Sequence, residues 1–138
     1  MPSSTPYISF PGNARTALEF YRDVFGGTLD LVTYEDIPME DMPITPPPGA
    51  VAHAQLHGGL VTLAGADDLG AEPQPLEGSA YSMMLMPETV EQGRELFEQL
   101  MTSDGRLEMP FELAPWGDHF GQVTDQFGVR WQVDVGPA

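Results

Sequence analysis

The sequence predicts an α+β fold in which two modules of the order strand–helix–strand–strand–strand follow each other along the chain. Segments with strand and helix periodicity occur in that order twice. The two helical segments align, Glu19–Val24 with Glu95–Leu100, which indicates an internal repeat. The chain also contains 15 Gly and 14 Pro, which suits many short elements joined by sharp turns.

The first module is predicted over about residues 5–65. A short apolar strand, Tyr7–Phe10, stops at Pro11-Gly12, and Asn13 is a suitable N-cap for a helix over Ala14–Phe25. Gly26-Gly27 ends this helix. Three segments rich in strand formers complete the module, the last two joined by a tight turn at Gly58-Gly59: Thr28–Tyr34, Ala50–His57 and Leu60–Ala64.

Two segments have too many turn residues to form regular elements. Ile37–Gly49 is rich in proline, and its length predicts either a mobile loop or a functional flap over a cavity or toward a partner subunit. The polar stretch over about residues 66–79 is predicted to be the linker between the modules. The carboxylate pairs in these loops, Asp67-Asp68 and Glu40-Asp41, are interpreted as solvated surface charge.

The second module is predicted over about residues 80–135. Ala80–Met86 is its first strand and Glu88–Met101 its helix. The three strands that follow are Arg106–Leu113, His119–Thr124 and Val129–Val135. Trp131 alternates with Val129 and Val133, which predicts a core position. Met83, Met84 and Met86 are also expected in the core, with an adaptable ligand-binding patch as the alternative.

Charge and composition exclude several classes of partner. The formal net charge is −16, and all the basic residues are Arg. Such a chain repels nucleic acid and anionic membrane surfaces. The sequence contains no Cys, no apolar stretch of membrane-spanning length and no secretory signal pattern. We therefore expect a cytoplasmic protein whose partner is a small organic molecule.

The order of the elements and several short motifs resemble the vicinal-oxygen-chelate superfamily of glyoxalases, bleomycin-resistance proteins and dioxygenases, and within it the PhnB-like branch. The motifs are Pro6–Phe10 with Gly12-Asn13, Ala17–Tyr21 with Phe25–Gly27, His53–Leu56, Trp116-Gly117, Phe120-Gly121 and Asp125–Trp131. This resemblance implies one domain, residues 1–138, in which two paired βαβββ modules form a curved mixed sheet around a cavity, with the helices outside. It also implies a homodimer.

The resemblance places the superfamily's four metal-ligand positions at Thr5, Thr62, Tyr81 and Gln132. None of these residues is His, Asp or Glu, and hydroxyl, phenol and amide groups hold a divalent ion poorly. We therefore expect neither a metal nor another cofactor. A divalent metal bound through His53 or His119 is the alternative.

Alternation along the third strand separates two faces. Ala52, Ala54 and Leu56 are predicted to pack against a helix, and the alternate positions to face the cavity: Val51, His53, Gln55 and His57. His53 is the candidate catalytic residue, because imidazole exchanges protons near neutral pH. A hydrogen-bonded structural histidine is the alternative. The predicted ligand-binding residues are Tyr7, Ser9, Gln55, Thr62, Tyr81, Trp116 and Gln132.

Hydroxyl, amide and aromatic groups together suit a neutral or weakly polar small molecule. We therefore predict a small-molecule-binding protein of the PhnB-like type without the superfamily's metal site. The alternative is an enzyme, either a lyase or isomerase or a metal-dependent glyoxalase or dioxygenase. In a lyase or isomerase His53 would be the general base, and Tyr81 or Gln132 would polarise a substrate oxygen.

Overall fold

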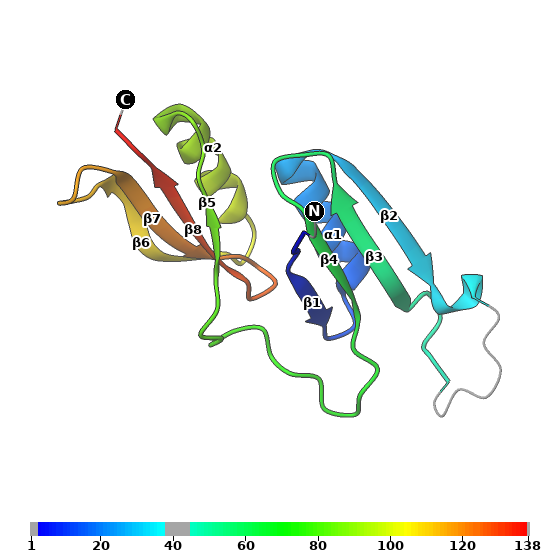
Figure 1. Cartoon of the computed structure of the whole chain (residues 1–138). Helices are drawn as coiled ribbons and strands as arrows, with labels where there is room; N and C mark the ends of the chain where they lie inside the picture. The colour runs from blue at the N-terminus through cyan, green and yellow to red at the C-terminus, as the bar shows by residue number, and fades with distance from the viewer. Residues whose placement is uncertain (1–2, 38–44, 138) are drawn as a thin grey trace. The chain divides into compact units, whose positions relative to one another are not determined.

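The computed structural model describes residues 3–37 and 45–137, and the chain divides into two compact units, Met1–Gln74 and Pro75–Ala138. Each unit contains one four-stranded mixed sheet and one helix that packs on it (Figure 1). The predicted α+β fold and the repeated element order are confirmed. No helix among the described residues is both long and apolar enough to cross a bilayer.

In the first unit the strand order is β1-β4-β3-β2, with β1 parallel to β4 and the other pairs antiparallel. Helix α1 covers one face, and its buried residues include Leu18, Tyr21 and Phe25. The regular elements are β1 (Tyr7–Phe10), α1 (Ala14–Phe25), β2 (Thr28–Thr33), β3 (Val51–His57) and β4 (Leu63–Asp67), with a short 3-10 helix at Tyr34–Asp36.

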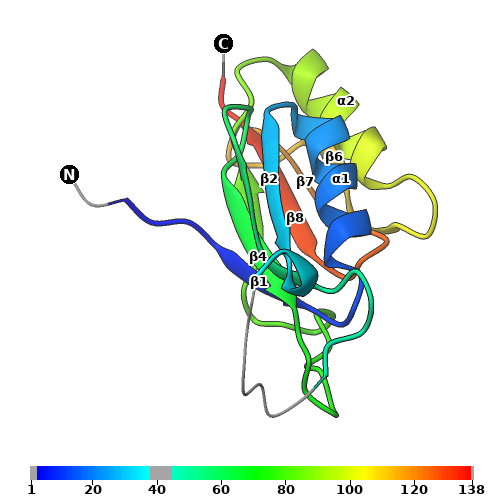
Figure 2. The same cartoon turned by 90° about the vertical axis from the view of Figure 1, so that its right-hand side faces the viewer.

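The second unit repeats this topology as β5-β8-β7-β6, with β5 parallel to β8. Helix α2 begins after Thr89, whose Oγ1 accepts a hydrogen bond from the Gln92 backbone N–H at 3.1 Å. It packs on β7 and β8, and Figure 2 shows it from a second side. The elements are β5 (Met83–Leu85), α2 (Val90–Leu100), β6 (Arg106–Leu113), β7 (His119–Thr124) and β8 (Arg130–Val135).

The predicted bounds of β1, α1, β6 and β7 are confirmed, and the largest error concerns β4. This strand was predicted at Leu60–Ala64 after a tight glycine turn, but it spans Leu63–Asp67. The reason is a close backbone contact. A Cβ on Gly59 would lie 2.3 Å from the Gly26 carbonyl oxygen, and the Leu60 N–H donates to the Phe25 carbonyl. The turn therefore packs on the end of α1, and the strand starts later.

The carboxylate of Asp67 is the main polar anchor of the first unit. This side chain is 9% exposed, and it accepts hydrogen bonds from two backbone N–H groups, those of Ala14 and Val51, both at 2.8 Å. It therefore joins the end of β4 to the first turn of α1 and to the start of β3. The interpretation of Asp67 as solvated surface charge was wrong.

The alternation predicted for β3 fails at its first residue. His53 pairs with Val32, but Val51 pairs with Thr33, so that Ala52 is an extra residue in a β-bulge. Val51 consequently turns to the core and is fully buried. His53, Gln55 and His57 are exposed on the other face, as predicted.

The first strand of the second unit is shorter than predicted. β5 contains only Met83–Leu85, and the residues before it have no regular structure. The expectation of core methionines was wrong for two of the three, because Met84 is 51% and Met86 71% exposed. Trp131 is a core residue, as predicted, and its indole N–H donates to Asp125 Oδ2 at 2.7 Å.

Part of the proline-rich segment Ile37–Gly49, with the Glu40-Asp41 pair, lies outside the described residues. At its near end, the backbone N–H and the hydroxyl of Thr33 donate to Asp36 Oδ2 at 3.0 and 2.9 Å. These bonds, together with the charge of Arg15, lower the pKa of Asp36. At its far end, the Gly49 N–H donates to Glu35 Oε1 at 2.6 Å.

Replacing Asp67 by Ala should lower the free energy of unfolding by about 2–4 kcal/mol, because two buried N–H groups would lose their acceptor. Chemical denaturation followed by circular dichroism measures the change. Asp68→Ala is the matched control, since among the described residues the side chain of Asp68 accepts a hydrogen bond only from the nearby Gly70 N–H. Equal losses in the two variants would contradict the anchoring role of Asp67.

Gly26 and Gly27 both have positive φ, of 76° and 101°, yet a Cβ would meet other backbone only at Gly27. Gly26→Ala should cost about 1–3 kcal/mol through backbone strain. Gly27→Ala should cost about 1–3 kcal/mol more, because its Cβ would lie 2.5 Å from the His57 carbonyl oxygen. Thermal unfolding of both variants compares these costs, and equal melting temperatures would contradict the close contact.

Candidate functional site

The face of the first sheet that α1 does not cover carries the predicted polar and aromatic residues. On β1, Ile8 and Phe10 are buried, and the alternate residues Tyr7 and Ser9 are exposed. On β3, the exposed positions His53 and Gln55 lie on the same side. We call Tyr7, Ser9, His53 and Gln55 the first open face.

Small residues of β4 separate the two strands of this face. Ala64 pairs with both Tyr7 and Gln55, so it lies between them. The methyl group of Ala64 is too short to keep the longer side chains apart. The rings of Tyr7 and His53 approach across β4, with their centroids 6.0 Å apart and an angle of 25° between their planes. The result is a stacked pair of exposed rings above a floor of small residues.

The polar atoms of the two histidines on β3 have different surroundings. His57 Nε2 lies 2.6 Å from Asp30 Oδ2 of the neighbouring strand β2. His53 has no hydrogen-bond partner among residues 3–37 and 45–137, so its ring contact with Tyr7 leaves both nitrogens available to a ligand. His53 therefore retains the donor and acceptor groups that a binding or catalytic role requires.

Thr62 is exposed immediately before β4, whereas Thr5 precedes β1. The cross-strand pairs of β1 with β4 begin at Tyr7 and Ala64, and each threonine lies two residues before the first paired residue of its strand. Thr62 thus lies at the end of the first open face, not between Tyr7 and His53.

In the second unit, Gln132 lies on the face of β8 opposite to α2, because it alternates with the buried residues Trp131 and Val133. Its Nε2 donates to Ser82 Oγ at 3.0 Å. Tyr81 lies outside β5 and is 88% exposed, so the structure does not bring it to Gln132. Ser82 therefore contacts Gln132 in place of the predicted Tyr81, which lies before the first residue of β5.

Trp116 is 63% exposed in the turn between β6 and β7, and its ring meets Phe120 edge-on with centroids 5.5 Å apart. His119 is half-buried, with its ring centroid 6.0 Å from that of Phe111. Among the described residues, His119 belongs to no group of His, Asp or Glu side chains that could hold a metal ion.

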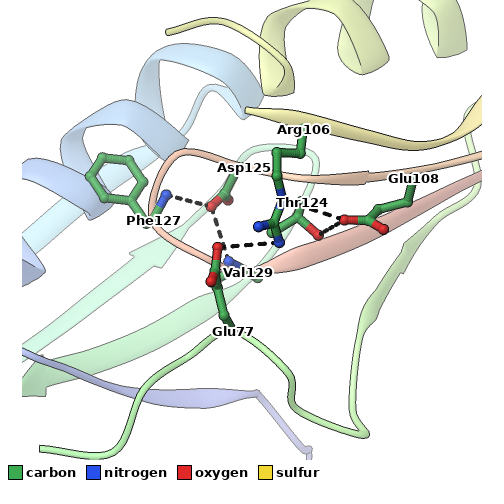
Figure 3. Close-up of polar contacts among 7 residues, drawn as sticks. All are labelled: Glu77, Arg106, Glu108, Thr124, Asp125, Phe127 and Val129. Atoms are coloured by element: carbon green, nitrogen blue, oxygen red, sulfur yellow. Dashed lines mark hydrogen bonds and ion pairs between the residues drawn. The ribbon is translucent and has the colours of Figure 1, made fainter. Parts of the chain in front are cut away.

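A polar cluster closes one end of the second sheet, as Figure 3 shows. Glu108 Oε1 accepts a hydrogen bond from the Thr124 hydroxyl at 3.0 Å and lies 3.6 Å from Arg106 Nε. Arg106 also pairs with Glu77 at 3.2 Å. In the adjoining turn, Asp125 Oδ1 accepts the backbone N–H groups of Phe127 and Val129. These contacts fix the turn that precedes β8.

At the other end of β8, two carboxyl groups lie close together. Burial raises the pKa of Asp134, and the neighbouring carboxyl of Asp118 raises it further. Asp134 Oδ1 is buried without a hydrogen-bond partner among the described residues. Sequence reasoning missed this pair, since its members are far apart along the chain and neither belongs to a motif.

The donor set does not fit the divalent metal that the fold family implies. Its four positions carry two threonines, a tyrosine outside any strand and a glutamine that is hydrogen-bonded to Ser82. In the part of the chain that the structure describes, no three His, Asp or Glu side chains form a group that could hold a metal ion.

A groove of about 330 Å³ lies elsewhere in the first unit, beside the start of α1. Its lining includes Gly12, Ala50, Asp67 and Leu69, and none of the predicted ligand-binding residues lines it. The groove and the first open face are therefore separate features of this unit.

Comparisons with known proteins agree with this architecture. The protein YjdN of Escherichia coli K12 is 33% identical over 147 residues, which cover 98% of this chain and 95% of YjdN. The crystal structure of protein PA1353 from Pseudomonas aeruginosa matches with a TM-score of 0.84 and 29% identity over all of both chains. A Bacillus cereus PhnB protein, described as a putative 3-demethylubiquinone-9 3-methyltransferase, matches with a TM-score of 0.77 and 26% identity. That match covers 98% of this chain and 100% of the other.

A family model described as "Glyoxalase/Bleomycin resistance protein/Dioxygenase superfamily" matches residues 7–133, nearly the whole of both units. It covers all of the first strand–helix–strand–strand–strand repeat and the second repeat up to Val133 in β8. The expected resemblance is confirmed. The chain belongs to the glyoxalase/bleomycin resistance protein/dioxygenase superfamily, and PhnB-like proteins are among its structural neighbours.

Proposed function

We propose that this protein binds a small organic molecule with a planar part, and that the first open face makes the principal contacts without a resident metal. The observation that carries this proposal is the exposed pair of Tyr7 and His53, whose rings stack across the small residue Ala64. Aromatic faces favour planar ligands, and stacking contributes about 0.5–1.5 kcal/mol per pair.

Polar groups beside the ring pair would orient such a ligand. His53 offers a nitrogen donor and acceptor, Gln55 an amide, and Ser9 a hydroxyl, all exposed on the same face. Binding sites for small molecules combine apolar or aromatic surface with a few such groups. The ligand class that matches is therefore a neutral planar molecule with a hydrogen-bonding substituent.

A catalytic function is the second candidate, and the availability of both His53 nitrogens favours it. A general base needs a side chain that reaches its substrate and exchanges protons at the working pH, and imidazole does so near neutrality. Turnover that follows a single ionisation and disappears in His53→Gln would establish this role. Weakened ligand affinity in that variant, with no turnover by the wild type, would support the binder.

We also propose a homodimer, because four strands lie at sheet edges in the described units: β1, β2, β5 and β6. Unpaired edges favour association with another chain unless they are covered. Sedimentation equilibrium gives the mass in solution. A mass of about 30 kDa, twice the 15.0 kDa of one chain, is expected, and a mass of one chain at micromolar concentration would contradict the proposal.

Benzamide, a neutral planar amide, tests the binding proposal. Its addition should shift the backbone amide signals of Tyr7 and His53 saturably in a ¹H–¹⁵N correlation spectrum. Tyr7→Ala and His53→Gln should each weaken binding about 3- to 10-fold through the loss of stacking.

His57→Gln is the matched control for His53→Gln, because His57 lies on the same strand but contacts Asp30. Its dissociation constant for benzamide should equal that of the wild type. The proposal fails if benzamide gives no saturable shift at the first open face, or if Tyr7→Ala and His57→Gln behave alike.

A further inference from the structure

The arginines of this acidic chain are mostly engaged. The formal net charge is −16, and there are five basic side chains, all of them Arg. Arg22 pairs with Asp23 at 3.5 Å, and Arg106 pairs with Glu77 and Glu108. The guanidinium carbon of Arg94 lies 5.5 Å from the centroid of the Phe111 ring.

Arg15 is exposed, and its charge helps to lower the pKa of Asp36. Arg130 is different, because it is half-buried. Its Nε is buried and has no hydrogen-bond partner in the described residues, and no described carboxylate forms an ion pair with it. A buried donor without an acceptor is costly, and acidic side chains outnumber basic ones by 21 to 5 in this sequence. The charge of Arg130 is therefore not neutralised by a carboxylate of the described residues, and it can attract an anion.

The position of Arg130 explains why it lacks an acidic partner. It pairs across strands with Thr124, whose hydroxyl donates to Glu108. Glu108 lies on the far side of Thr124 and also contacts Arg106. Glu108, the carboxylate beyond Thr124, is therefore engaged with other partners.

Arg130 and Gln132 lie on the same face of β8, since the residues between and beyond them are buried. Met84 pairs with Gln132 from the parallel strand β5 and is 51% exposed. This face thus joins a cationic group to an apolar side chain. We call Arg130, Gln132 and Met84 the second open face.

We infer that Arg130 binds the oxyanion of a small organic acid, a carboxylate or a phosphonate, whose apolar part rests on Met84. The inference goes beyond the proposed function, because it concerns a second, anionic ligand at the second open face. Guanidinium groups bind such oxyanions through paired N–H donors. A large polyanion does not match, because the net charge of the chain would repel it.

The test observes the Arg side chains directly in the full-length wild-type protein. The five Arg Nε–H groups give separate ¹H–¹⁵N signals, which variants assign. Benzoate and phenylphosphonate are the probes, and benzamide is the neutral isostere of benzoate. We expect both acids to shift the Arg130 signal saturably and to leave Arg106 unchanged, whereas benzamide leaves both unchanged.

Substitutions give the second readout. Arg130→Gln should weaken benzoate binding at least 10-fold, and Arg106→Gln, the control with its charge already paired, less than 2-fold. If Arg130→Gln does not fold, Arg130→Lys keeps the charge but loses the paired donors, and should weaken binding severalfold. The inference is overturned if neither acid shifts the Arg130 signal, or if binding is equal in the Arg130 and Arg106 variants.

The two proposals fail in different ways. If benzamide binds the first open face but neither acid shifts Arg130, the inference is wrong and the proposed function stands. If the acids shift Arg130 but benzamide does not perturb Tyr7 or His53, the ligand class of the proposed function is wrong.

Discussion

The buried carboxylate of Asp67 is the contact on which the first unit depends most. It holds the first N–H of α1 and the first N–H of β3, at the end of the strand that lies between β1 and β3. The pairing of β1 and β3 with β4 places Tyr7 and Gln55 on either side of Ala64, and His53 follows two residues from Gln55 on the same face. The two hydrogen bonds of Asp67 thus support the strands that carry the open face.

The two units have the same strand order, but different buried carboxylates hold their backbones. In the second unit the anchor is Asp125, which accepts two backbone N–H groups and the Trp131 indole just before β8. In each sheet a helix packs on one face, and polar or aromatic side chains are exposed on the other. On the first open face, an aromatic ring and uncharged polar side chains surround His53. The second open face combines Arg130 with Met84. One repeated fold therefore presents two kinds of chemistry.

Local signals predicted much of this fold. Tyr7–Phe10 and Ala14–Phe25 were predicted with their observed bounds, because a Pro-Gly stop and a Gly pair mark their ends. The β4 strand was misplaced because its start depends on Gly59 meeting Gly26, a contact between residues far apart in the sequence. The bulge that buries Val51 was equally invisible to a period-two pattern. Arg130 was not predicted as a site residue, because the lack of an ion-pair partner depends on the surroundings of a side chain and not on its residue type.

The exposure of Met84 has a chemical consequence for the second open face. Thioethers at a protein surface react with peroxides before buried ones do, and the product is a polar, chiral sulfoxide. Oxidation at Met84 would replace the apolar part of that face by a strong acceptor oxygen and leave Arg130 in place. The same protein would then present a face for more hydrophilic anions, and reduction of the sulfoxide would restore the original preference.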